Sequence, residues 1–281
     1  HCTVMVIETG LGGALDSTNA LPHNPLCSVI TRIGFDHMAI LGNTLTKIAC
    51  EKAGIMKRHT PVVVSPQEPE AAAALLCYYH EHFDKANASA YYQVVPQEEI
   101  TRMSAAPFRL RGLHQWENAA LAKTAFETVY PAFSPEETCR ILGETVWMGR
   151  MEILSETPFL MVDGAHNGHG VAALGRSLAA LYPGKKFHFL MGVMADKDYP
   201  EMIKELLPLA LDFCTYTPES ERALQARELA CYISSCGVAA RECCDLEQYL
   251  SSLPEDAPNV AFGSLYFIGD LEALWAKRKK E

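Results

Sequence analysis

The sequence lacks several features that would each define a class of protein. It has no uninterrupted apolar run of the roughly 18 residues that a membrane-spanning helix needs, and no signal-peptide pattern opens it. It also has no excess of basic residues, because 24 lysines and arginines stand against 34 aspartates and glutamates, a net charge of −10. Binding a nucleic-acid backbone calls for a basic surface. We therefore expect neither a membrane nor a nucleic acid as partner.

Two common nucleotide-binding loops are missing as well. No Gly-x-x-x-x-Gly-Lys-Ser/Thr segment is present that could cradle phosphates. No Gly-x-Gly-x-x-Gly follows a predicted strand either, which argues against a nicotinamide dehydrogenase.

The ten cysteines do not follow the spacing of metal sites or of disulfide frameworks. There is no Cys-x-x-Cys pair, and Cys27, Cys77 and Cys214 lie in apolar runs. We expect reduced thiols that pack as small hydrophobic groups, and hence a cytoplasmic protein.

Length and pattern favour an α/β protein of two domains. At 281 residues the chain is too long for one comfortable core. Its second half alternates short apolar strands with helix-like segments, the pattern of a parallel sheet. We place the boundary at Trp147-Met148-Gly149-Arg150, which gives domains 1–147 and 148–281.

Two predicted strands near the start deliver polar residues to one edge of a sheet. Residues 4–7 are apolar and read as a buried strand that ends at Glu8, and residues 27–30 lead through Gly34 to Asp36-His37. Ligands collect beyond the carboxyl ends of parallel strands. Glu8 and His37 could therefore meet there and hold a divalent cation, although two ligands do not identify it.

A helix is predicted between Thr44 and Lys57, and Lys52 lies on its apolar stripe. Apolar surroundings disfavour the charged amine, so we expect a lowered pKa and a group that can act as nucleophile, base or acceptor of carbon dioxide. The alternative is a lysine whose stem reaches to water.

In the second half, Asp163-Gly164-Ala165-His166-Asn167 follows a predicted strand and opens a helix, an arrangement that favours an anion. Asp196 and Lys197 follow the next strand. Lys197 could meet a substrate carboxylate or only a neighbouring aspartate.

Three longer motifs resemble the folylpolyglutamate synthase/dihydrofolate synthase family, ATP-dependent amide ligases of the Mur-ligase superfamily. They are Ile7-Glu8-Thr9-Gly10-Leu11-Gly12-Gly13-Ala14-Leu15-Asp16-Ser17-Thr18-Asn19, Ile33-Gly34-Phe35-Asp36-His37-Met38 and Glu51-Lys52-Ala53-Gly54-Ile55. The resemblance extends to Gly263-Ser264-Leu265-Tyr266. Ala14 departs from it, because the family usually has arginine there, which puts a substrate or phosphate contact at that position in doubt.

The resemblance implies the remainder of a P-loop-type ATPase domain in residues 1–147 and a Rossmann-like glutamate-ligase domain in 148–281. In the family the phosphate loop precedes the point where this chain opens. We therefore expect a fragment whose missing N-terminal part is its partner and which is inactive alone.

The resemblance also implies roles for single residues in this first domain. Glu8 and His37 match magnesium ligands, and Asp16, Ser17 and Thr18 match positions near the pterin substrate. Lys52 matches a lysine that the family carries as a carbamate, a change that turns a cation into an anion beside the metal.

Further matches concern the nucleotide and the amino acid. Asn118 matches an asparagine placed against the ATP base, and Arg150 an arginine that contacts ATP phosphates. Asp163 matches a ribose-binding aspartate, and His166 a histidine close to the incoming glutamate.

The implied reaction uses ATP and Mg²⁺ to add L-glutamate to folate or dihydropteroate through an acyl phosphate. Two alternatives stay open: a Mur-type peptide ligase of cell-wall synthesis, and a ligand-binding fragment without activity. The residues do not separate dihydrofolate synthase from folylpolyglutamate synthase.

Overall fold

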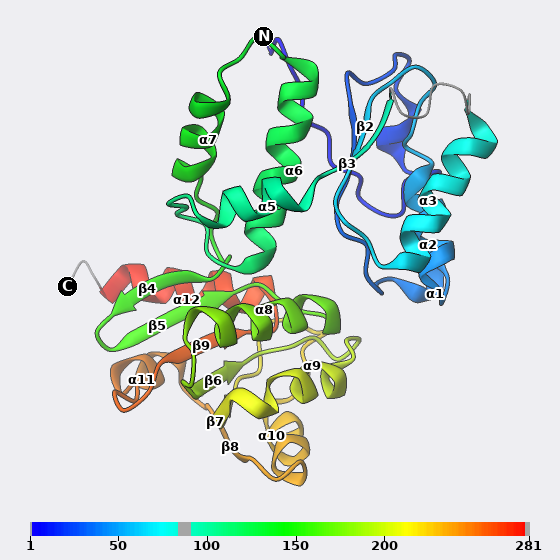
Figure 1. Ribbon diagram of the computed structural model, residues 1–281. Coiled ribbons are helices and arrows are strands. Elements are labelled where there is room, and N and C mark those ends of the chain that lie inside the picture. The colour runs from blue at the N-terminus through cyan, green and yellow to red at the C-terminus, as the bar shows by residue number, and fades with distance from the viewer. Residues whose placement is uncertain (1, 84–90, 279–281) are drawn as a thin grey trace. The chain divides into compact units, whose positions relative to one another are not determined.

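The structure is a computed structural model that describes residues 2–83 and 91–278 (Figure 1). The chain forms two compact units, residues 1–107 with 115–144 and residues 108–114 with 145–281. The segment 108–114, assigned by sequence to the first domain, thus belongs to the second unit. No helix of the described residues combines the length and apolarity needed to cross a bilayer.

The first unit contains a small parallel sheet in the order β1-β2-β3. Val29 of β1 lies opposite Val63 of β2, which lies opposite Gln93 of β3. Val62 and Val64 of β2 are buried because helices α2 and α3 pack on that face of the sheet through residues such as Ile48 and Leu75, and Val63 is buried as well. The elements of this unit are η1 (Ser17–Ala20), β1 (Ser28–Ile30), α1 (Met38–Leu41), α2 (Leu45–Ala53), β2 (Val62–Val64), α3 (Pro69–His82), β3 (Tyr92–Val94), α5 (Gln97–Ser104), α6 (Leu113–Val129, of which 113–114 are assigned to the second unit) and α7 (Pro135–Glu144).

The predicted strand at residues 4–7 is wrong. These residues have no regular secondary structure, and Val6 is 97% exposed. An apolar run becomes a strand only where a neighbour accepts its backbone hydrogen bonds. Within the described residues the sheet of this unit holds β1, β2 and β3, and none of them pairs with residues 4–7.

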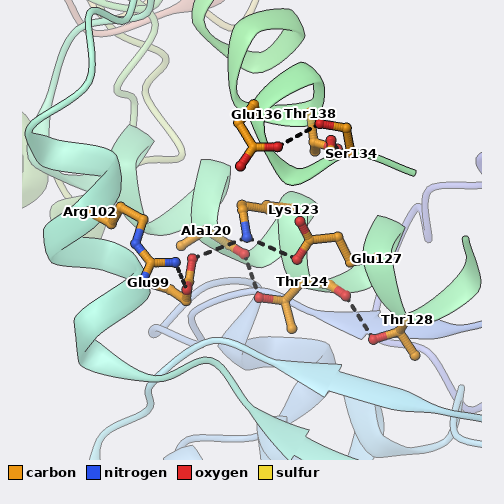
Figure 2. A network of polar contacts seen from close by, with 10 residues as sticks. All are labelled: Glu99, Arg102, Ala120, Lys123, Thr124, Glu127, Thr128, Ser134, Glu136 and Thr138. Atoms are coloured by element: carbon orange, nitrogen blue, oxygen red, sulfur yellow. Dashed lines mark hydrogen bonds and ion pairs between the residues drawn. The ribbon is translucent and has the colours of Figure 1, made fainter. Parts of the chain in front are cut away.

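A polar network joins helices α5 and α6 (Figure 2). Lys123 of α6 is 5% exposed, and its Nζ lies 3.3 Å from Glu99 Oε2 and 2.9 Å from Glu127 Oε2. Burial alone would lower the pKa of the lysine, but hydrogen bonds to Glu127 and Glu99 raise it on balance. The ammonium therefore stays charged and holds Glu99 of α5 against α6.

The second unit is built on a six-stranded sheet in the order β4-β5-β9-β6-β7-β8. β4 runs antiparallel to β5, and the other neighbours are parallel. Its elements are β4 (Glu152–Glu156), β5 (Phe159–Asp163), α8 (Gly168–Leu181), β6 (Phe187–Met191), α9 (Tyr199–Leu206), η3 (Leu207–Leu209), β7 (Ala210–Thr215), α10 (Ala226–Ser235), β8 (Ala239–Glu242), α11 (Leu246–Ser251), β9 (Asn259–Phe262) and α12 (Leu265–Arg278).

Helices cover both faces of this sheet (Figure 1). Side chains of α8, α9 and α10 pack with Met161, Phe189 and Phe262 on one face. Side chains of α11 and α12 pack with Leu160, Leu190 and other residues on the opposite face. Alternate residues along each strand point to opposite sides, so the central strands are apolar at most of their positions.

The connections after three central strands diverge at their carboxyl ends. β5 and β6 lead into α8 and α9 on one face, whereas β9, which lies between them, leads into α12 on the other. Ligands bind where neighbouring connections of a parallel sheet part in this way. The loops after β5, β6 and β9 therefore define the expected binding edge of the second unit.

Candidate functional site

In the first unit, Asp16 organises the loop that carries the first motif. Its Oδ2 accepts hydrogen bonds from the amides of Gly10 (3.1 Å) and Leu11 (3.0 Å), and its Oδ1 accepts from the amide (2.9 Å) and hydroxyl (2.5 Å) of Thr18. These bonds, with that from the Thr18 hydroxyl first, lower the pKa of Asp16 to about 2. Both carboxylate oxygens are used to shape the loop, and the exposed Ser17 opens the short helix η1 inside it.

This loop packs directly on the end of α2, where Lys52 lies. The amide of Ala14 donates to the carbonyl of Glu51 (2.9 Å), and Asn19 donates to the carbonyls of Ala14 and Gly54. A Cβ on Gly13 would stand 2.7 Å from the Glu51 carbonyl oxygen, so only glycine allows this approach. Lys52 is half-buried in the last turn of α2.

The predicted metal ligands Glu8 and His37 belong to no group of three potential ligands among the described residues. Glu8 and His37 are exposed, and His37 precedes α1 in a left-handed conformation (φ 48°), 3.9 Å from an Asp36 carboxylate oxygen. No hydrogen bond or ion pair of the described residues joins Glu8, His37 and Lys52. Within the same residues there is no group of three potential metal ligands.

Asn118 lies exposed on α6, where its Nδ2 donates to Gln115 Oε1 at 3.3 Å. The neighbouring Glu117 accepts from Arg32 (3.3 Å), which follows β1 and also pairs with Glu68 (2.8 Å). These ion pairs connect the helix that carries Asn118 to the carboxyl end of β1.

In the second unit, Asp163 is buried at the end of β5. Its Oδ2 accepts from the amide of Met151 and its Oδ1 from the amide of Ala165, both at 2.9 Å. Burial raises the pKa of Asp163, although the two amides and the charge of Arg150 act in the opposite direction. Each oxygen keeps a second lone pair for a further donor.

Arg150 and His166 gather around the same turn. A Cβ on Gly164 would stand 2.5 Å from Arg150 Nη1, so glycine lets the guanidinium lie against the turn. His166 Nδ1 lies 2.8 Å from the carbonyl oxygen of Gly164. A carbonyl only accepts, so Nδ1 carries the proton, and in the neutral ring Nε2 is left as an acceptor. The structure therefore brings Arg150, Asp163 and His166 together.

Lys197 lies half-buried in the loop after β6, at the same edge of the sheet. Asp196, the neighbouring aspartate, instead pairs with Arg222 at 2.8 Å. No carboxylate of the described residues forms an ion pair with Lys197. Its charge is therefore available to a ligand.

Sequence reasoning missed a second group of cationic residues. Arg109 and Arg111 line a cavity together with Trp147 and Arg150, all within the second unit. His114 lies close by, and burial, followed by the charges of Arg150, Arg176 and His169, lowers its pKa to about 4. These residues belong to no sequence motif, and exposed arginines alone do not indicate a binding site.

The second unit belongs to a class of known ligase domain. Residues 149–259 match the family model described as Mur ligase, glutamate ligase domain.

Relatives extend the likeness to both units. The chain is 34% identical over 289 residues to the dihydrofolate synthase/folylpolyglutamate synthase of Bacillus subtilis, covering 95% of this chain and 66% of that protein. It is 32% identical over 283 residues to the folylpolyglutamate synthase of Lacticaseibacillus casei, covering 94% and 64%. The Mycobacterium tuberculosis folylpolyglutamate synthase complexed with ADP has a TM-score of 0.80 at 25% identity, over 95% of this chain and 66% of that one.

The chain belongs to the folylpolyglutamate synthase/dihydrofolate synthase family of Mur ligases. It spans 66% and 64% of the length of the two relatives named above. The predicted fold class, α/β with a Rossmann-like C-terminal domain, is confirmed.

Proposed function

We propose that this protein catalyses the ATP-dependent addition of L-glutamate to folate or dihydropteroate. The observation that carries the proposal is the family likeness, which covers 95% of the chain at 34% identity. In this reaction an acceptor carboxylate takes the terminal phosphate of ATP, and the amine of glutamate then displaces that phosphate to form an amide.

ATP is the proposed phosphate donor, and Arg150, Asp163 and Asn118 are its proposed ligands. A related synthase was solved with ADP, which supports a nucleotide here. The Arg150 guanidinium is suited to phosphate oxygens because its planar fork donates two parallel hydrogen bonds. The free lone pairs of Asp163 suit ribose hydroxyls, and the amide of Asn118 suits the edge of adenine.

The glutamate site is proposed at His166 and Lys197. Both follow strands on either side of β9, where the connections diverge. The Lys197 ammonium would hold a carboxylate of glutamate. The Nε2 atom of His166 would take a proton from its amine, which must lose one to become a nucleophile.

Asp16, Ser17, Thr18 and Lys52 are proposed to serve the acceptor side. Asp16 and Thr18 fix the loop, and the loop contacts the turn that carries Lys52. Family likeness supports a carbamate on Lys52. A half-buried amine can form it by the loss of a proton and attack on carbon dioxide.

Magnesium fits these residues only in part. Glu8 offers the oxygen ligand that the ion prefers, whereas imidazole, as in His37, is more typical of zinc, copper or iron. With no group of three potential ligands in the described residues, we derive no step through the metal. Glu8 and His37 remain its proposed ligands. A cytoplasmic location is also proposed, and the ten free cysteines support it.

The test, on the chain extended at its N-terminus to the full length of its relatives, is an assay of ATP-dependent incorporation of labelled glutamate into dihydropteroate, folate or a UDP-sugar acceptor. We expect activity with one or both pterins, and a loss of at least about 100-fold in kcat/KM for His166→Ala, the range of general-base contributions. Glu8→Gln should raise the magnesium concentration required. Arg140→Gln, on an exposed face of α7, is the matched control and should change neither kcat/KM nor the magnesium concentration required.

Three results would contradict the proposal. Activity with the UDP-sugar alone would identify a Mur-type peptide ligase. ATP binding to the 281-residue chain by calorimetry, without ligation by the extended chain, would identify a ligand-binding fragment. Normal activity of His166→Ala would remove that residue from the mechanism.

A further inference from the structure

The second unit contains an open cavity of about 870 Å³ beside the start of β4. Three arginines line it, Arg109, Arg111 and Arg150, together with two glutamates, Glu152 and Glu156. The proposed nucleotide site uses only Arg150. The other two arginines therefore have no role in the function proposed above.

Arg109 and Arg111 are exposed cations in a chain of net charge −10. Four of the other ten arginines, at positions 32, 102, 140 and 222, pair with a carboxylate. No described carboxylate forms an ion pair with Arg109 or Arg111, although acidic side chains outnumber basic ones. Glu152 of the cavity already accepts a hydrogen bond from the amide of Gly149 (3.0 Å). The cavity therefore presents cations that the chain itself leaves unpaired.

An apolar ridge borders the same cavity. Val146, Trp147 and Met148 are 58%, 69% and 70% exposed, and all three line the cavity. Consecutive large apolar side chains are rarely left in water without a partner. The preferred ligand thus combines several negative charges with short apolar stretches.

We propose that this cavity binds the chain of glutamates carried by an acceptor that has already been extended. Whichever of its carboxyl groups forms the link, each glutamate residue keeps one free carboxylate and two methylene groups. The carboxylates suit the forks of Arg109 and Arg111, and the methylenes suit the indole of Trp147. The inference rests on the proposed function, since only repeated glutamate addition produces such a chain. It assigns this protein to the members that elongate a glutamate tail.

The test follows the indole N–H signals of the 281-residue chain by NMR during titration with glutamate, triglutamate and pentaglutamate peptides. The chain has three tryptophans, and Trp147→Phe assigns the signal of interest. Trp275, whose Nε1 donates to the Leu154 carbonyl oxygen (3.1 Å), is an internal reference for folding. We expect a saturable shift of the Trp147 signal, with affinity rising at each added glutamate.

Two variants with the same loss of charge separate a site from general attraction. Arg109→Gln/Arg111→Gln should weaken pentaglutamate binding by about tenfold or more, and glutamate binding by less than about threefold, because only the longer peptide reaches both guanidinium groups. Lys185→Gln/Arg227→Gln, at exposed positions that do not line the cavity, should change the binding of neither pentaglutamate nor glutamate. Glu156→Gln should tighten pentaglutamate binding by removing a repelling charge.

Several outcomes would overturn the proposal. One is a Trp147 signal that pentaglutamate does not move. Another is equal weakening by the two double variants. A third is a shift of the Trp147 signal that ADP causes and pentaglutamate does not, and that the Arg109→Gln/Arg111→Gln variant abolishes. That result would assign the cavity to the nucleotide. The ligation assay is independent, so pentaglutamate binding without ligation would refute the proposed function and leave this site standing.

Discussion

At the scale of single residues, the polar side chains of the motifs mostly hold the backbone in place. Asp16 uses both carboxylate oxygens to hold Gly10, Leu11 and Thr18, and Asp163 uses both of its own to join Met151 to Ala165. A residue that belongs to a recognisable motif therefore need not contact a ligand. Its effect on a substrate can pass through the loop that it shapes.

Asp16 leads to a prediction on pH. Its pKa is about 2 in the folded chain against an ordinary value of 3.8, so its stabilising effect is complete above about pH 4 and is lost as the pH falls toward 2. The loop from Gly10 to Thr18 should loosen over that window. Hydrogen exchange of the Gly10 and Leu11 amides measures this loss directly.

Asp16→Asn should produce the same loosening at neutral pH. Its amide NH₂ would face the amides of Gly10 and Leu11, and their exchange should accelerate by about tenfold, the effect of one charge-assisted hydrogen bond. Ser17→Ala, next in the chain and exposed, is the control and should leave exchange unchanged. Equal exchange in Asp16→Asn and the wild type would show that the carboxylate does not hold the loop.

At the scale of elements, the ion triad of Lys123, Glu99 and Glu127 is predicted to fasten α5 to α6 (Figure 2). Lys123→Met keeps the length of the side chain but leaves Glu127, 28% exposed, without its cation, and leaves Glu99, 19% exposed, with only the exposed Arg102. We expect a loss of about 2–4 kcal/mol in the free energy of unfolding, because removing one partner strands a half-buried charge. Urea unfolding monitored by circular dichroism measures it.

A control variant and a compensating variant test whether the unpaired glutamates cause the loss of stability. Arg140→Met breaks two ion pairs, with Glu137 and Glu144, at exposed positions of α7 and should cost less than about 0.5 kcal/mol. Adding Glu99→Gln and Glu127→Gln to Lys123→Met should recover part of the loss. A Lys123→Met protein as stable as Arg140→Met would rule out a stabilising triad.

Elements were predictable from sequence where burial dictates composition. The strands β2, β6 and β9 are buried throughout and read as apolar runs. Helix α5 was missed because Met103 is its one buried residue, so it has no apolar stripe. Residues 4–7 were mispredicted for the opposite reason, since an apolar run does not reveal whether a neighbouring strand exists.

The candidate site divides in the same way. His166 and Lys197 could be predicted to lie at one edge of the sheet because each follows the carboxyl end of a strand. The strand order β5-β9-β6 places them there. Arg109, Arg111 and Trp147 gather from two stretches of chain with no shared motif. Only the folded chain brings these residues together.

At the scale of the whole molecule, each unit has its own hydrophobic core. In the second unit separate clusters cover the two faces of the sheet, and both are complete within residues 151–275. The segment 108–114 supplies no residue of either cluster, although its Gly112 lies close to Met151. Its Leu113 amide donates to Ser177 Oγ at 3.1 Å, and that hydroxyl also donates to Ala173.

We therefore predict that the polypeptide 145–281 folds alone. It should show cooperative thermal unfolding with a Tm within about 5 °C of one transition of the full chain, because the loss of one hydrogen bond costs about 1 kcal/mol. Near-UV circular dichroism, which reports packed aromatic side chains, should match the contribution of Trp147 and Trp275 in the full chain. A polypeptide 145–281 with a helical far-UV signal but no near-UV signal and no cooperative transition would show that the core of the second unit depends on the first unit. The complementary polypeptide 1–144 is the control that identifies the remaining transition of the full chain.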